Sequence, residues 1–182
     1  MSGPVGNNTA RASGVIASAG SGAILQLKSL EVTGAGSENG STPSQLSQFD
    51  MSFAATESDS KLLFQAHMSL GGGVSSAGYF YDVTNGAKIG PIGNAAGSRQ
   101  LVTFGGQGTC ANYYPWVISF GAWHEPGTTS SIDYTIYGNC DASTTLYINR
   151  SKTDGNDGYL YSARLASTFM ITEYAADTVT LT

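Results

Sequence analysis

The chain has 182 residues, a formal net charge of −5 and only 12% charged residues, about half of the ~25% in an average domain. This balance argues against a nucleic-acid partner, because the eight Lys and Arg are scattered and cannot neutralise a row of phosphates. No apolar run approaches the ~20 residues of a membrane helix, so we expect no membrane insertion. The 24 Gly, 10 Tyr, 7 Phe and 2 Trp favour an all-β protein with short strands and Gly-rich turns.

The first segment, residues 1–21, is small and polar and has no hydrophobic period, which predicts an extended N-terminal arm. We expect a neighbouring subunit or another partner to hold this arm in place. It has no basic region followed by an apolar core, so it predicts no secretory signal and a protein that folds in a cytosol. Cys110 and Cys140 are then expected to be free thiols, with a disulfide as the open alternative.

Strand signals begin after the arm and recur along the rest of the chain. Segment 61–70 alternates most clearly, with Leu62, Phe64 and Met68 on one side. Asn85-Gly86 predicts a type I′ hairpin turn within segment 78–90. Residues 22–176 are therefore predicted to form one antiparallel β-sandwich of jelly-roll type, followed by a short tail, 177–182. The expected strands are 23–32, 48–53, 61–70, 78–90, 99–104, 116–123, 132–138, 145–150 and 167–175.

Two of these strands carry aromatic side chains on both faces. In 116–123, Trp116 shares a face with Phe120, whereas Val117 and Trp123 lie on the other, and in 78–83 two tyrosines lie opposite Phe80. The outer face of a monomeric sandwich is ordinarily polar, so the pattern predicts an oligomer in which another subunit covers one outer face. The alternative is that these aromatics are simply half-exposed. The residues expected at the interface are Tyr79, Tyr81, Trp116, Val117 and Trp123.

Catalytic and cofactor signals are weak throughout the chain. His67 falls on the polar face of a strand and His124 at the end of another, and the spacing identifies neither an orienting acid nor a nucleophile for them. Cys110 lies in a Gly-rich loop, where a nucleophile is far rarer than an ordinary cysteine. The sequence therefore predicts a protein that is not an enzyme and binds no cofactor.

The segment 149–159, NRSKTDGNDGY, resembles a metal loop and a glycosylation site without matching either well. Asp154 and Asn156 have the spacing of a calcium loop, but position 158 is Gly and no bidentate Glu follows. No zinc spacing is present elsewhere, so we expect no metal and interpret 154–158 as a turn. The sequon at Asn149 is interpreted as a consequence of composition, because a cytosolic protein does not meet the glycosylation machinery.

Four segments together resemble a family of bacteriophage virion proteins that is common in cyanophages. They are SDSKLLFQ (58–65), AAGSRQ (95–100), YINRS (147–151) with the turn that follows it, and ASTFMITEY (166–174). The resemblance covers about residues 22–176, and it departs from the family at 106–117 and in the tail.

The resemblance implies a non-enzymatic particle protein with a jelly roll similar to tumour-necrosis-factor and complement-head domains, which assemble as trimers. We expect a capsid decoration or cement protein, assembled in the host cytoplasm, whose arm contacts the major capsid protein or other virion proteins. The alternative is a tail-fibre or receptor-binding tip that binds host surface glycan. Tyr113, Tyr114 and Tyr159 are its expected contacts, with Trp123 nearby, because aromatic faces stack on sugar rings.

Overall fold

The computed structural model describes residues 24–72, 75–95, 97–106, 115–141, 144–156, 158–159, 162–177, 179 and 181. The predicted arm, 1–21, lies outside these ranges, so its placement stays a prediction. The described part is built of strands and one short 3-10 turn, η1 (Ser47–Phe49). In that part of the chain no helix has the length and apolar character to cross a membrane.

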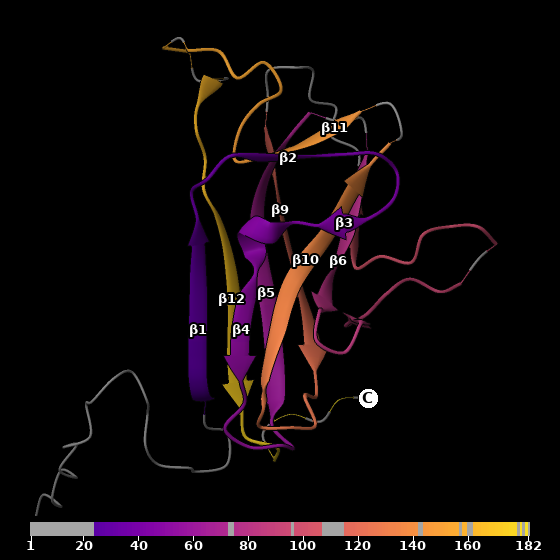
Figure 1. Cartoon of the computed structure of the whole chain (residues 1–182), viewed down its shortest axis with the longest axis vertical. Coiled ribbons are helices and arrows are strands. Elements are labelled where there is room, and N and C mark those ends of the chain that lie inside the picture. The colour runs from indigo at the N-terminus through magenta and orange to yellow at the C-terminus, as the bar shows by residue number, and fades with distance from the viewer. Residues whose placement is uncertain are drawn as a thin grey trace, which may run out of the picture.

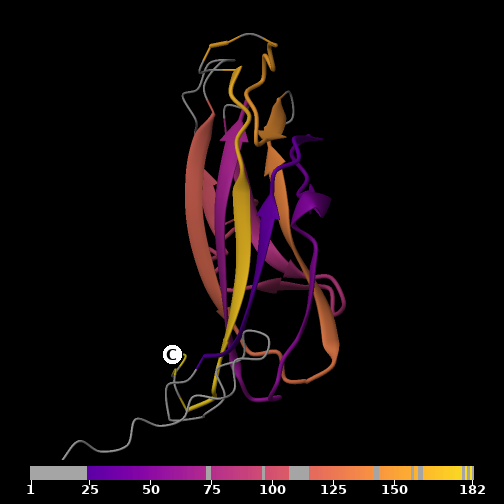
Figure 2. The ribbon, with the colours of Figure 1, turned by 90° about the vertical axis from the view of Figure 1, so that its left-hand side faces the viewer.

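Twelve strands form two antiparallel sheets that lie face to face (Figures 1 and 2). In Figure 2, β9 (coral) and β12 (yellow) belong to one layer and β10 (orange) to the other. The strands are β1 (Ile24–Val32), β2 (Gly36–Asn39), β3 (Ser44–Gln45), β4 (Met51–Ala54), β5 (Lys61–Gly71), β6 (Ser76–Asp82), β7 (Ala87–Ile89), β8 (Phe104–Gly106), β9 (Trp116–His124), β10 (Ser131–Cys140), β11 (Thr145–Ile148) and β12 (Ser167–Tyr174).

The order of these strands makes the sandwich a jelly roll. The first sheet runs β1–β12–β5–β9, and the second runs β4–β10–β6–β7. The first strand thus pairs with the last, and the chain passes between the two sheets as two Greek keys do. Strands β2 and β11 extend the first sheet beside one end of β5, and β3 and β8 extend the second. The predicted fold class is confirmed.

The core follows from the alternation of inward and outward side chains along the long strands, which is clearest in the first part of β5. In β5, Leu62, Phe64 and Met68 are fully buried, while Gln65 and His67 are exposed. Phe64 lies between the two sheets, with its ring centroid 4.9 Å from that of Tyr134 in β10 and 6.1 Å from that of Phe169 in β12. Each fully buried side chain of this size contributes about 1.5–3 kcal/mol, so the paired inner faces supply most of the stabilisation.

Two local predictions were wrong. The β6–β7 hairpin has a four-residue loop, 83–86, and only Gly86 in it has a positive φ (69°), whereas a type I′ turn needs two such residues. The carboxylate of Asp82 accepts hydrogen bonds from the backbone N–H and side-chain amide of Asn85 at 2.8 and 2.7 Å, which holds the longer loop. The strand expected at 99–104 begins only at Phe104, and just before it the Thr103 N–H donates to the carbonyl oxygen of Gly78 in β6 at 2.8 Å.

Candidate functional site

The outer face of the first sheet is where the described structure most resembles an interaction surface. The register of the four long strands aligns side chains into rows that cross the whole sheet. These rows are Leu27–Thr172–Leu63–Trp123, Ser29–Met170–Gln65–Gly121 and Glu31–Thr168–His67–Ser119. We call this surface the hollowed face.

The hollowed face is almost free of charge. Glu31 carries the one carboxylate in the three rows, and none of them holds a Lys or Arg. Lys28 of β1 points to the other side of the sheet, where its Nζ donates to the carbonyl oxygen of Ser52 at 2.7 Å. Leu27 and Val117 are each 53% exposed on the outside of the sheet. A partly apolar surface of this width with so little charge is characteristic of a protein contact.

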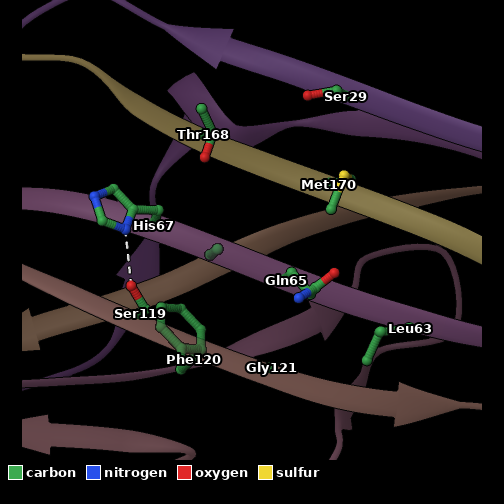
Figure 3. A pocket seen from close by; sticks show the side chains of 10 residues that line it. Ser29, Leu63, Gln65, His67, Ser119, Phe120, Gly121, Thr168 and Met170 are labelled. Atoms are coloured by element: carbon green, nitrogen blue, oxygen red, sulfur yellow. Dashed lines mark hydrogen bonds between the residues drawn. The ribbon is translucent and has the colours of Figure 1, made fainter.

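A shallow hollow of about 530 Å³ lies in the middle of this face (Figure 3). Gly121 creates it, because β9 places no side chain at this position. A Cβ added there would lie 3.0 Å from the backbone oxygen of Phe64. Apolar Leu63 and Met170 and polar Gln65 surround the gap. The residues that line the hollow are Ser29, Leu63, Gln65, Ala66, His67, Ser119, Phe120, Gly121, Thr168 and Met170.

His67 and Ser119, directly opposite each other on neighbouring strands, are hydrogen-bonded at one end of the hollow with Nδ1 and Oγ 2.8 Å apart (Figure 3). No local sequence pattern indicated this pair, because 52 residues separate its members. Nucleophilic catalysis by such a pair needs a third group that orients the imidazole. Among the described residues no carboxylate makes a hydrogen bond to His67. The arrangement is suited to holding a polar group of a partner by hydrogen bonds.

The five residues predicted to form one interface lie in three places. Trp123 is on the hollowed face, where its ring packs 5.4 Å from that of Tyr174, and Val117 lies on the same side of the sheet, just beyond the third row and opposite Ser69. Trp116 is turned inward and packs against the core. Tyr79 and Tyr81 lie on the outer face of the second sheet.

The tyrosines of the second sheet form their own cluster with Tyr137. The rings of Tyr79 and Tyr137 stack at 5.8 Å with 13° between their planes, and the rings of Tyr81 and Tyr137 are 4.4 Å apart. The ammonium of Lys88 lies 4.2 Å from the centre of the Tyr79 ring and donates to the carbonyl oxygen of Leu101. Burial, followed by the neighbouring tyrosines, raises the pKa of Tyr79. The chain itself therefore covers Tyr79, which is only 6% exposed.

The residues expected to contact glycan are only partly described. Tyr113 and Tyr114 lie outside the described residues, as does Cys110. Tyr159 is 64% exposed in the loop between β11 and β12. Trp123 is at the opposite end of the sheet from that loop, because it pairs with Leu63 whereas β11 pairs with the far end of β5. Trp123 and Tyr159 therefore do not form one surface.

Asp154 of the calcium-like segment is held by arginines. Its carboxylate forms ion pairs with Arg150 at 3.2 Å and with Arg164 at 2.8 Å, and its own φ is 46°. Two guanidinium groups neutralise the charge that a calcium ion would need. No cluster of three His, Cys, Asp or Glu suited to a metal occurs in the described part of the chain. Cys140 is a buried free thiol there, and its Sγ lies 3.0 Å from the carbonyl oxygen of Thr144.

Asn149 of the sequon is a structural residue, fully buried and in the left-handed region (φ 58°). Its side-chain amide donates to the carbonyl oxygens of Val32 (2.6 Å) and Gly34 (3.1 Å). Its side-chain oxygen accepts from the hydroxyl of Ser167 at 2.6 Å. The residue thereby joins the end of β1 to the start of β12, a role that the sequence did not reveal.

A polar pair in the core was also missed. His124 Nε2 and the hydroxyl of Tyr134 are buried without a hydrogen-bond partner among the described residues, and the two rings meet edge to face at 5.8 Å. Burial lowers the pKa of His124, although the carboxylates of Asp82 and Glu125 oppose the effect. Burial, aided by Asp82, raises the pKa of Tyr134. Both groups are thus held neutral around pH 7.

No family model and no curated protein matches this chain. Three solved structures of infectious bursal disease virus are similar: the Gx strain (11% identity, TM-score 0.36), the VP2 subviral particle (9%, 0.35) and T=1 particles of the D431N mutant VP2 (11%, 0.36). The matches cover 82%, 82% and 85% of this chain but only 36%, 38% and 36% of those chains. The jelly-roll assignment rests on the strand order of this chain itself.

Proposed function

We propose that this chain is a non-enzymatic structural protein of a virus particle, a homotrimer on the particle surface that decorates or cements the capsid. The hollowed face carries the proposal, because a surface four strands wide with a single carboxylate is suited to burial against another copy. The resemblance of residues 22–176 to phage virion proteins supports the placement on a particle.

In this role the trimer adds buried area across the joints between capsid subunits. Each Å² of apolar surface removed from water contributes roughly 25 cal/mol, which opposes the outward pressure of a packaged genome. The arm, 1–21, is proposed to contact the major capsid protein or other virion proteins, and assembly is proposed to take place in the host cytoplasm.

A second candidate is a tail-fibre or receptor-binding tip that holds host surface glycan. The observation that favours it is Tyr159, whose side chain is 64% exposed in a loop rich in Asp, Asn and Gly. An exposed tyrosine ring stacks on a sugar ring, and neighbouring polar groups hydrogen-bond its hydroxyls.

Native mass spectrometry of the full chain tests the trimer. We expect a trimer for the natural sequence and its loss in Met170→Glu, which places a carboxylate in the hollow beside Ser29 and Gln65. Val83→Glu is the matched control, because Val83 is also partly exposed (38%) but lies in the β6–β7 turn of the other sheet. A natural chain that is monomeric at micromolar concentration contradicts the proposal.

Imaging of intact particles decides between the two placements. Regular density on the capsid surface supports decoration, and density confined to the tail tip supports the receptor-binding alternative. In the second case, loss of host-cell binding in Tyr159→Ala identifies the contact.

A further inference from the structure

Edge strands decide where a β-sandwich can add further strands, and nearly all edges of this one are short or protected. The described edge strands of the second sheet have two to four residues: β3 two, β4 four, β7 three and β8 three. In the first sheet, β2 has four. Short edges offer too few free backbone groups to pair with another chain.

The two long edges of the first sheet differ. Edge strand β1 contains Lys28 and Glu31 and has a register shift between Ile24 and Gln26. Gln26 and Lys28 also donate to backbone oxygens of β4, at 2.7 Å each, which ties this edge to the second sheet. Charges, bulges and covering contacts are the devices by which proteins prevent edge pairing.

Within the described ranges, edge strand β9 has none of these devices. Its nine residues, WVISFGAWH, include no Lys, Arg, Asp, Glu or Pro and are rich in β-branched and aromatic types. Its backbone pairs with β5 along its whole length in a continuous register, and no other described residue pairs with its second side. A long, uncharged, regular edge of this kind is a template for another strand.

The sequence of β9 fits a second copy of itself. Suppose two β9 strands run antiparallel around a two-fold axis at Phe120. Val117 of one copy then lies opposite Trp123 of the other, and Ser119 lies opposite Gly121. A β-branched residue faces an aromatic one, which is a stabilising cross-strand pair, and two small residues face each other. No charged residue of β9 meets a like charge in this register.

We propose that copies of this chain pair through β9 in this register, so that two first sheets join into one continuous sheet. The proposal rests on the proposed function in that both require self-association, and it adds a two-fold contact to the proposed three-fold one. A trimer has three β9 edges, so each trimer joins three neighbours. Combined two-fold and three-fold contacts produce closed or extended layers, which suits a protein that covers a particle.

Register-specific disulfide formation tests the pairing. In the proposed register Pro115 of one copy lies opposite Glu125 of the other, just beyond the strand ends. We would prepare Pro115→Cys and Glu125→Cys as separate full-length chains, each with Cys110→Ser to remove the cysteine outside the described residues. Ser47→Cys in the same background is the control, because Ser47 is exposed in η1, which packs against β1 and β10. Thermal melts establish that all three chains fold.

We expect a covalent dimer when Pro115→Cys and Glu125→Cys chains are mixed under mild oxidation, with the 115–125 link identified by mass spectrometry. Each variant alone gives none, because equivalent positions lie ten residues, or about 33 Å, apart along the pair. A mixture that links no more than the Ser47→Cys control overturns the proposal. So does equal linkage in the single variants.

Native mass spectrometry separates this failure from failure of the proposed function. Trimers without the 115–125 link overturn the β9 pairing alone. Monomers without the link overturn both, and a dimer with the link supports the pairing and contradicts the trimer.

Discussion

The two edge strands of the first sheet, β1 and β9, have the same length, nine residues, but opposite chemistry. Edge strand β1 is closed onto the second sheet by Gln26 and Lys28, and buried polar groups secure both of its ends. Edge strand β9 is uncharged and bonds only to β5 among the described strands. The sheet therefore has one edge, β1, that contacts within the described chain cover, and one edge, β9, that they leave for a partner. We call these the closed edge and the open edge.

This difference predicts where substitutions act. Changes at the closed edge remove hydrogen bonds that the fold itself uses, so they lower the free energy of unfolding. Changes to the exposed side chains of the open edge, such as Val117, remove little from the folded chain, so they alter association instead. The four predictions below run from the largest expected effect on folding to the smallest.

Glu173 holds the first residues of β1, at one end of the closed edge, and its substitution is expected to have the largest effect on the free energy of unfolding. Its buried carboxylate accepts hydrogen bonds from Gln26 Nε2 (2.6 Å), from the Thr56 N–H (2.7 Å) and hydroxyl (3.0 Å), and from the Glu57 N–H (3.2 Å). Glu173→Ala leaves these donors unpaired, so we expect a loss of about 4 kcal/mol in urea unfolding. Glu31→Gln, on the exposed side of β1, is the control and should change stability by less than about 0.5 kcal/mol. An unchanged unfolding midpoint for Glu173→Ala would refute this role.

Asn149 holds the last residue of β1, Val32, at the other end of the same edge. Asn149→Ala removes three side-chain hydrogen bonds and places a Cβ-bearing, non-Asn residue at φ 58°. We expect a loss of about 3 kcal/mol by the same measurement. Asn156→Ala is the matched control, because Asn156 is exposed in the loop that follows. Equal stability of the two variants would show that the Asn149 network contributes little.

His124, at the end of the open edge, predicts a pH dependence of folding. Burial lowers its pKa in the folded chain, so below its ordinary value of about 6.5 the unfolded chain binds the proton more readily. The contribution to stability is fully present above this pH and is lost as the pH falls below it. His124→Phe keeps the ring contacts with Phe64 and Tyr134, so its unfolding free energy should vary less between pH 7 and pH 5. Parallel curves for both chains contradict this assignment.

Val117 gives the smallest effect on folding and a large effect on association. Its side chain is 53% exposed on β9, so Val117→Lys should change the unfolding free energy by less than about 0.5 kcal/mol. The new lysine would face Trp123 of a paired copy and desolvate a charge, so β9 pairing should be lost in cross-linking and sedimentation. Val83→Lys, in the β6–β7 turn, should leave pairing intact. Pairing that survives Val117→Lys excludes this register.

The sequence predicted which face of a strand each side chain occupies, but not which sheet the strand joins. Alternation correctly separated Trp116 from Val117 and Trp123, because the period of a strand is two. Tyr79 and Tyr81 were predicted to share one interface with these residues, although they lie on the other sheet. The sheet to which a strand belongs depends on long-range pairing, which no local pattern contains. For the same reason the contacts of Asn149 and the bond between His67 and Ser119 had no local signal.

Amide hydrogen exchange compares the two edges directly. We would measure peptides covering β1 (24–32) and β9 (116–124) in the natural full chain at about 1 and about 100 μM, since pairing between copies increases with concentration. Pairing through β9 predicts that its free-edge amides exchange more slowly at the higher concentration, whereas β1 exchanges at the same rate at both. Exchange of β9 that is fast and independent of concentration would contradict an edge left open for a second copy.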